Sequence, residues 1–361
     1  MAQESKERIA LFDNVKGVAI VLVVVGHFVE RSMSYRTGSH LAQTILTFIY
    51  IFHMPVFIFC SGLFAGKSWR KNKRAPVDKF LLYLILYAVF CALVAVLDLV
   101  IFQRGSTLNP FALDSAPWFL LALALMMLFV PLLGSLPAAP VLVVSIALAV
   151  GAGLSLPSNT ELTLLRVFTY FPYFAIGFYL TPERVQQFVE KVRGKLGAIP
   201  TMVAAILAFA LIVVVLYAAC GDGTLRGIKR MSSGLNLITA VAESSGQPLW
   251  LLVLFRILEY PVVLCFIALL FLAVPMKRCP LSALGERSLQ VYIVHILILY
   301  ALDYLGLIEL MVASNPVWLL TVIAVGVALA AVLAIPRFPQ NWVNKLGAWL
   351  KKVVSQGSEL A

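Results

Sequence analysis

The sequence contains little charge for its length. Aspartate, glutamate, lysine and arginine make up 12% of the 361 residues, whereas hydrophobic residues make up 61%. An ordinary soluble domain carries about 25% charged residues. This shortage of charge excludes a soluble globular domain and predicts an integral membrane protein.

The sequence also lacks the short motifs that mark several classes of enzyme. It has no Walker loop, no dinucleotide-binding glycine motif, no internal repeat and no cysteines or histidines at metal-ligand spacing. Its cysteines are expected mostly within membrane spans or at their ends, where they act as small packing residues. We therefore expect neither a metal nor disulfide bonds. The five cysteines are Cys60, Cys91, Cys220, Cys265 and Cys279.

Long hydrophobic runs are present instead. A helix of ~20 apolar residues crosses a bilayer, and helices bond all their backbone groups internally. The runs lack the alternation of barrel strands. The sequence therefore predicts an all-α integral membrane protein, a bundle of about ten transmembrane helices over residues 1–336, with a basic cytoplasmic tail at 337–361. The expected spans are 10–30, 41–65, 79–102, 117–134, 140–156, 162–181, 198–219, 249–274, 286–308 and 315–336.

The net charge of +11 is distributed unevenly along the chain. Basic residues gather in the loops that follow the second, sixth, eighth and tenth expected spans, and the alternate loops hold fewer. Loops rich in lysine and arginine face the cytoplasm, so both chain termini are predicted to be cytoplasmic. Because topology accounts for most of the charge, we expect no nucleic-acid partner.

The first expected span carries ionisable residues at its start and deep inside it. Lys16 and His27 are eleven residues apart, which in a helix is about three turns and roughly 16 Å, so both point to one face. Asp13, three residues before Lys16, lies close to that face. Ionisable groups inside a span are costly and mark functional sites by default. The alternative is a histidine that only bonds to a neighbouring helix.

Two further histidines are expected near the depth of His27. His53 lies about 20 Å from the cytoplasmic end of the second span, and His295 about 15 Å into the ninth. Because Pro55 interrupts the backbone bonding of its helix, His53 has an alternative role in capping that defect. His40, in the loop between the first two spans, is expected to be solvated and without a role.

Several other residues that could take part in a functional site also have a structural interpretation. The basic run Lys67–Lys79 either sets topology alone or grips the phosphates of a cytoplasmic cofactor. Trp118 anchors a helix start at the interface, and Arg166 can snorkel to the outer interface. Arg256 and Glu259, three residues apart, can form an ion pair on one helix face.

Motifs in five of the expected spans occur in a recognisable order. The matching stretches are Phe12–Phe28 with Lys16 ten residues before His27, Phe52-His53-Met54-Pro55 with Ser61-Gly62, Trp118-Phe119-Leu120, Arg166 with Tyr170–Gly177, and Gly285–His295. Together they resemble the membrane-bound acyltransferase family 3, and in particular its fucose 4-O-acetylase-related branch. The resemblance covers most of the chain.

This resemblance implies an O-acyltransferase of the bacterial cytoplasmic membrane, usually an O-acetyltransferase. Such an enzyme moves an acyl group from cytoplasmic acyl-CoA, with acetyl-CoA as the usual donor, to a hydroxyl of a sugar or cell-envelope glycan. His27 is then the candidate general base, or the site of a transient acyl-histidine, because histidine takes up protons near neutral pH. The other candidate catalytic residues are Lys16, Asp13 and His53, and Lys16, Asp13 or a buried neighbour would set the tautomer of His27.

The resemblance also indicates which residues bind the two substrates. The family's R-x-x-R pair is matched in spacing by Lys71 and Arg74 and in position by Lys79. The candidates for binding acyl-CoA are Arg70, Arg74 and Lys79. The candidates for binding the acceptor substrate are Trp118, Arg166, Arg256 and His295.

Two other classes of function stay open on the sequence. A secondary transporter or flippase also buries ionisable residues near the membrane midplane, although the two halves of this chain do not correspond. A purely structural membrane protein leaves three histidines at one depth unexplained. Residues 220–247, rich in glycine and serine and without a helical period, are either an acceptor-binding loop or a flexible one.

The alternating basic loops predict the orientation of the chain. Reporter fusions at residues 70, 190 and 280 and at the C-terminus are expected to report a cytoplasmic location, and a fusion at residue 230 an outer location. A cytoplasmic signal at 230 together with an outer signal at 190 would overturn the predicted depths of the histidines.

Overall fold

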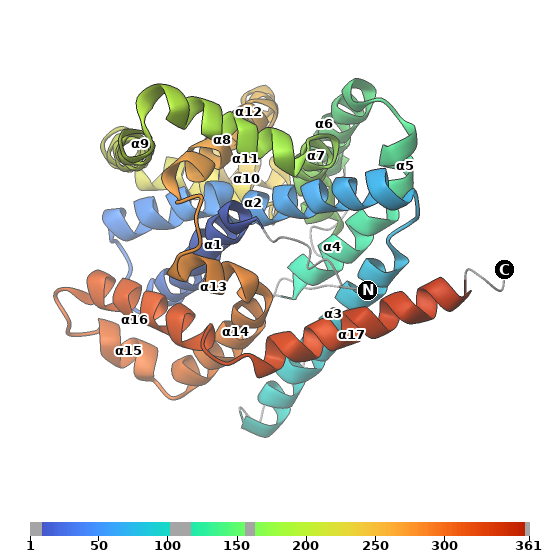
Figure 1. The fold of residues 1–361 in the computed structure, drawn as a ribbon. Coiled ribbons are helices and arrows are strands. Elements are labelled where there is room, and N and C mark those ends of the chain that lie inside the picture. The colour runs from blue at the N-terminus through green and yellow to red at the C-terminus, as the bar shows by residue number, and fades with distance from the viewer. Residues whose placement is uncertain (1–8, 102–116, 156–162, 358–361) are drawn as a thin grey trace.

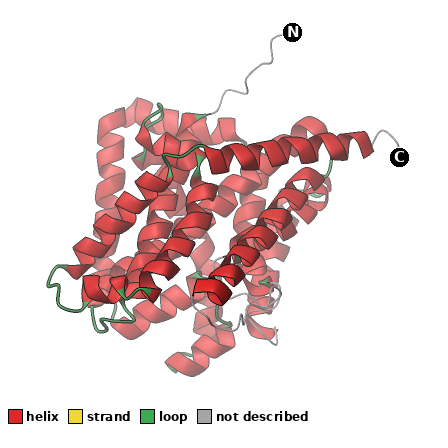
Figure 2. Cartoon of the chain, turned by 90° about the horizontal axis from the view of Figure 1, so that it is seen from below, coloured by secondary structure: helices red, strands yellow, loops and turns green. Residues whose placement is uncertain are grey.

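The structure is a computed structural model that describes residues 9–101, 117–155 and 163–357. These residues form helices and include no β-strand, which confirms the all-α fold. Figures 1 and 2 show the helices packed side by side as a bundle. The helices are α1 (Ala10–Ser32), α2 (His40–Asn72), α3 (Val77–Val96), η1 (Leu97–Ile101), α4 (Trp118–Leu128), α5 (Val130–Ser135), α6 (Ala138–Ser155), α7 (Leu164–Tyr179), α8 (Pro182–Leu196), α9 (Ala198–Ala219), α10 (Asp222–Ser232), α11 (Ile238–Ser245), α12 (Leu249–Ala273), α13 (Pro280–Glu286), α14 (Ser288–Tyr304), α15 (Leu307–Val312), α16 (Trp318–Leu333) and α17 (Phe338–Gly357).

Each expected span coincides mainly with one helix or with two consecutive helices, and residues 102, 156 and 162 of the expected spans lie outside the described residues. Within the described ranges, seven helices are long and apolar enough to cross a membrane: α1, α2, α3 with the start of η1, α4 with α5, α6, α9 and α12. The apolar helices α14 and α16 are shorter, with 17 and 16 residues. Helix α7 also has 16 residues and carries Arg166. The expectation of apolar spanning helices is confirmed, and their number and orientation stay predictions.

The stretch 220–247, expected to have no helical period, contains α10 and α11. Leu225 and Met231 of α10 are buried, and Thr47 of α2 donates a hydrogen bond of 3.2 Å to the Leu225 carbonyl. A helix this short is stabilised by such tertiary contacts and not by its own sequence. The expectation of an irregular loop was therefore wrong.

Helix α1 is buried at the centre of the bundle, where it packs against α2, α13, α14 and α16 (Figure 1). Its polar residue Asn14 is fully buried and bonds to the connection between α12 and α13. The amide nitrogen of Asn14 donates to the carbonyls of Pro275 and Lys277 at 2.7 and 2.9 Å, and its oxygen accepts from the Ser282 hydroxyl at 2.6 Å. These bonds satisfy the amide and hold α1 against the connection between α12 and α13 and the start of α13.

Helices α2 and α7 pack with their backbones in direct contact. Gly62 and Gly66 of α2 are four residues apart and share one helix face. A Cβ atom at Gly62 would overlap the carbonyl oxygen of Phe174, and one at Gly66 would overlap that of Phe178. Gly177 makes the reciprocal contact from α7. This small-xxx-small pattern is how membrane helices approach closely without a hydrophobic driving force.

The expected basic tail contains the long helix α17, which contacts α3 and α14. Figure 2 shows α17 lying across the same end of the bundle at which the described chain begins. Val343 and Leu350 are buried, whereas Trp342 and Trp349 are exposed. Exposed tryptophans beside lysines are typical of a helix at a membrane surface.

The contact between α2 and α7 predicts that Gly62→Ala destabilises the protein. The added methyl group has to push the α7 backbone away, and overpacking of this kind costs about 1–3 kcal/mol. The measurement is the thermal unfolding midpoint of the purified protein in detergent. Gly151→Ala in α6 is the matched control, because a Cβ atom there meets no atom within 4 Å. An equal midpoint for both variants would contradict the close packing.

Candidate functional site

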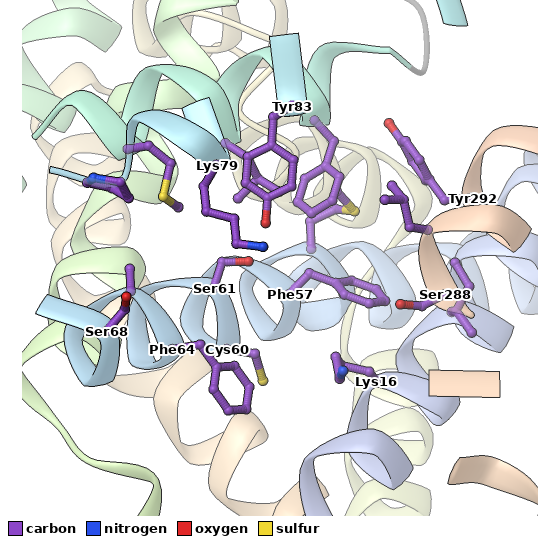
Figure 3. A pocket seen from close by; sticks show the side chains of 18 of the residues that line it. Lys16, Phe57, Cys60, Ser61, Phe64, Ser68, Lys79, Tyr83, Ser288 and Tyr292 are labelled. Carbon is purple, nitrogen blue, oxygen red and sulfur yellow. The ribbon is translucent and has the colours of Figure 1, made fainter. Parts of the chain in front are cut away.

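A cavity of about 280 Å³ lies between α1, α2, α3, α4 and α14. Its wall is mainly aromatic and aliphatic, and the hydroxyl residues Ser61, Ser68 and Ser288 interrupt it. Figure 3 shows Ser288 and Tyr292 of α14 at the side of the cavity opposite to Ser68. The small side chains of the three serines leave space between helices that otherwise pack tightly.

Two lysines from different helices line this cavity. Figure 3 shows the Lys79 amine, from the start of α3, reaching toward Ser61. Lys16 enters from α1, and its amine lies 2.8 Å from a carboxylate oxygen of Asp13. Asp78 lies at the same edge as Lys79. Two ammonium groups in a mainly apolar cavity favour an anionic ligand.

Helix α1 leads from this cavity to His27. Lys16, Ile20 and Val23 line the cavity, and their spacing of four and three residues keeps them on one helix face. His27 is the next residue on this face, about 6 Å beyond Val23 along the axis. The unbroken helix α1 therefore joins the cationic part of the cavity to the first histidine.

His27 contacts His295 of α14. Ser288 and Tyr292 line the cavity, and His295 follows Tyr292 by three residues. The Nδ1 atom of His27 lies 2.9 Å from the Nε2 atom of His295, and the two rings are parallel within 5°. His295 is completely buried. The two histidines that were expected at nearly one depth are therefore in contact, and their depth in a membrane stays a prediction.

His53 is buried in α2 and bonds within its own helix. Its Nδ1 atom donates to the Ile49 carbonyl oxygen at 2.7 Å. The carbonyl that Pro55 leaves without a backbone donor is that of Ile51, four residues earlier. His53 is therefore held by a different carbonyl from the one its expected capping role requires. The Tyr50 ring lies 5.0 Å from the His53 ring.

A polar cluster that the sequence did not reveal lies near the histidines. The Glu30 carboxylate accepts hydrogen bonds from the Tyr50 hydroxyl and the Lys229 amine, and Lys229 also lies 4.8 Å above the Tyr50 ring. We call these three residues the outer cluster. Glu30 is three residues after His27, so the helical period would have placed it near the face of His27. Nothing in the sequence links it to Lys229, 199 residues away.

Trp118, Arg166 and Tyr170 form a stack. The Arg166 guanidinium lies 4.5 Å over the Trp118 ring, and the rings of Trp118 and Tyr170 are 5.5 Å apart. Arg166 is only 6% exposed, so it packs inside the protein and does not snorkel to its surface. The Tyr170 hydroxyl donates to the Ser232 carbonyl at 2.9 Å, which holds the end of α10 beside the stack.

Arg256 forms the expected ion pair with Glu259 at 2.6 Å, and both side chains are buried. The same guanidinium donates to the Met231 carbonyl at 2.6 Å. Two buried charges satisfy each other here, which is the condition for tolerating them inside a membrane protein. The observed contacts of Arg256 therefore fasten α12 to α10.

The basic run Lys67–Lys79 divides into residues with different contacts. Arg70 donates to the carbonyls of Phe178 and Leu180 at 2.8 Å each and so caps the end of α7. Lys67 pairs with Glu183 at 2.8 Å, and this bond lowers the pKa of the Glu183 carboxyl. Arg74 is exposed. Among the basic side chains of this run that the structure describes, Lys79 is the one that lines the cavity.

His40 has partners, contrary to the expectation of a solvated loop residue. It begins α2, and its Nδ1 atom lies 2.5 Å from a carboxylate oxygen of Asp222, while its Nε2 atom lies 2.8 Å from the Tyr217 carbonyl. These contacts fasten α2 to the connection between α9 and α10. Over the described residues, histidine, cysteine and carboxylate side chains form no group of three or more that could hold a metal ion.

Comparison with known proteins defines the class of this protein. The acyltransferase domain family matches residues 9–335. The chain therefore belongs to this acyltransferase family, whose members transfer groups other than aminoacyl groups. An enzyme of this class uses an acyl donor, and this membership decides between the acyltransferase and transporter interpretations in favour of the former.

Two curated proteins are similar to parts of the chain. The nodulation protein NolL of Sinorhizobium fredii is 28% identical over 192 residues, which cover 51% of this chain and 52% of the relative. NolL of Mesorhizobium japonicum is 27% identical over 175 residues, or 46% of each chain. The chain thus spans about half the length of the curated relatives it matches. No solved structure matches.

The different contacts of Lys79 and Arg70 predict different effects of the same substitution. Lys79→Gln is expected to raise the KM for the acyl donor about tenfold, which corresponds to one charged contact of about 1.4 kcal/mol, and to leave the thermal midpoint unchanged. Arg70→Gln is expected to lower the thermal midpoint, because two carbonyls of the α7 end lose their donor. Steady-state kinetics and thermal unfolding of both variants test this. A lowered midpoint for Lys79→Gln with an unchanged KM would refute the assignment.

Proposed function

We propose that the protein transfers an acyl group, in the usual case acetyl, from cytoplasmic acyl-CoA to a hydroxyl of a sugar or cell-envelope glycan. The site is in the bacterial cytoplasmic membrane, and His27 is the general base. The observation that supports this function most directly is that the face of α1 that lines a cavity with Lys16 and Lys79 also carries His27, one turn beyond the cavity, in contact with the buried His295. The cavity suits an anionic donor, and the histidines suit proton transfer.

The size of the cavity supports an elongated donor that is only partly enclosed. Pockets for drug-sized ligands measure about 300–1,000 Å³, so a cavity of about 280 Å³ has room for the thioester end of acyl-CoA and not for its nucleotide. The pantetheine arm is roughly as long as four extended residues, about 14 Å. Lys16 and His27 are about 16 Å apart along α1. Phosphates near the lysines would thus place the thioester near His27.

The cationic residues differ in how readily they can bind phosphates. Lys79 and Lys16 line the cavity, and Arg74 is exposed on the connection before α3. Arg70 would have to release the two carbonyls that it holds. We therefore assign the donor phosphates to Lys79, Lys16 and Arg74 and give Arg70 a structural role. Asp13 orients Lys16 through their ion pair.

The proposed reaction needs one base that accepts and returns a proton. His27 removes the proton of the acceptor hydroxyl as the oxygen attacks the thioester carbon, so that a carbon–oxygen bond forms. The carbon–sulfur bond then breaks, and the thiolate of CoA takes the proton from His27. The products are an ester and CoA in its thiol form. Removal of such a base typically costs 10²–10⁴-fold in rate.

The acceptor would approach from the side of the outer cluster. Trp118 and Tyr170 provide flat apolar faces, and Glu30 and Lys229 provide polar groups for hydroxyls, the mixture that orients ligands in binding sites. The Glu30 side chain is 41% exposed, so this cluster is open to solvent. Arg256 contributes indirectly, by fastening α10, which carries Lys229, to α12.

This function predicts that His27→Ala abolishes acyl transfer. The expected fall in kcat is about 10²–10⁴-fold, with normal membrane insertion and accumulation. The measurement is transfer of radiolabelled acetyl from acetyl-CoA to glycans of membranes that contain each variant. Lys16→Ala is expected to raise the KM for the donor, since it removes a cation from the cavity.

His40→Ala is the matched control for this prediction. It also removes a histidine side chain, but one that lies outside the cavity. The variant is therefore expected to lower thermal stability and to keep the turnover number of each folded molecule. Full activity of His27→Ala would refute His27 as the base. Absence of acetyl transfer by the wild-type protein from any acyl-CoA would refute the proposed function itself.

A further inference from the structure

The hydrogen bonds of His295 determine where its proton lies. Its Nδ1 atom is 2.9 Å from the carbonyl oxygen of Val291, one turn earlier in α14. A carbonyl oxygen only accepts hydrogen bonds, so Nδ1 of His295 carries a hydrogen. A neutral imidazole has one donor and one acceptor nitrogen. Nε2 of His295 is then an acceptor, and with both rings neutral no unbalanced charge is buried at this depth.

The proton of His27 follows from that of His295. The atom of His27 that faces Nε2 of His295, at 2.9 Å, is Nδ1. Because Nε2 of His295 accepts, Nδ1 of His27 donates. The lone pair of His27 is therefore on Nε2, which is the nitrogen available to take a proton from a substrate. A chain of two hydrogen bonds thus runs from the α14 backbone to the base.

The other groups considered for this role have different partners. The Lys16 amine pairs with Asp13, about three turns away from His27 along α1. His53 donates to the Ile49 carbonyl within α2. Of Lys16, His53 and His295, only His295 is shown in contact with a ring nitrogen of His27, so His295 is the residue that can select the tautomer of His27.

We infer that His295 is a positioning residue that holds His27 in the tautomer with a free Nε2, a role that rests on the proposed function of His27 as base. In a serine protease triad an aspartate holds the catalytic histidine in its correct tautomer in the same way. His295 gives up no proton in this arrangement. It accepts a hydrogen bond from Nδ1 of His27 throughout, including while Nε2 of His27 carries the proton taken from the acceptor hydroxyl. The bond to Val291 fixes the ring of His295, and α14 carries that bond.

The test compares His295→Gln with His295→Asn. The amide oxygen of glutamine can occupy the position of Nε2 and accept from His27, whereas that of asparagine reaches only the position of Nδ1. We expect His295→Asn to lower kcat by roughly 10²-fold or more, with an unchanged KM for acetyl-CoA. We expect His295→Gln to stay within about tenfold of the wild type. If His295 only filled space, the glutamine and asparagine variants would not differ in kcat while keeping the same KM.

A second measurement needs no variant at His295. Solid-state nitrogen NMR of the histidine-labelled wild-type protein in bilayers is expected to show His27 protonated at Nδ1 and unprotonated at Nε2, with the His27→Gln protein providing the assignment. A proton on Nε2 of His27 would overturn the inference. Equal losses of kcat in the glutamine and asparagine variants, with both proteins folded, would overturn it as well. In either case an inactive His27→Ala would still support the proposed function. The role of His295 and the role of His27 as base can therefore fail separately.

Discussion

A polar side chain inside a bilayer has no water to bond with, and this constraint organises the interior of the protein. Helix α1 carries several such groups, and three of them bond to protein partners. Asn14 bonds to the connection before α13, Asp13 bonds to Lys16, and His27 bonds to His295. Because unsatisfied polar groups cost several kcal/mol in hydrocarbon, these contacts determine how α1 sits among its neighbours.

The same constraint explains which site features sequence reasoning found. Hydropathy is a local property, so the spans and the depth of each histidine follow from counting residues along single helices. That counting placed His27 and His295 at a common depth, and the structure brings them into contact. It could not tell that the two rings share a hydrogen bond, because 268 residues separate them. Partners of this kind depend on how helices are arranged around α1.

The contacts that sequence reasoning could not foresee are those with partners on distant helices. Arg70 looked like a phosphate ligand because basic residues surround it, but the backbone end of α7 occupies its guanidinium. His40 looked solvated because its neighbours are polar, but Asp222 and the Tyr217 carbonyl bind it. Helix α10 was missed because its glycines hide its period, and packing against α2 stabilises it. In each case a long-range contact outweighs the local pattern.

The length of α2 has a consequence for how a donor reaches the cavity. With 33 residues it is about 50 Å long at 1.5 Å per residue, whereas the hydrocarbon core of a bilayer is about 30 Å thick. A helix of this length exceeds the hydrocarbon core, and its polar last turns, Lys67–Asn72, are the end expected to lie among the headgroups. Ser68, which lines the cavity, is in this part. If the donor is the proposed acyl-CoA, one end of the cavity is then within reach of the aqueous phase, so the thioester end can enter while the nucleotide stays in water.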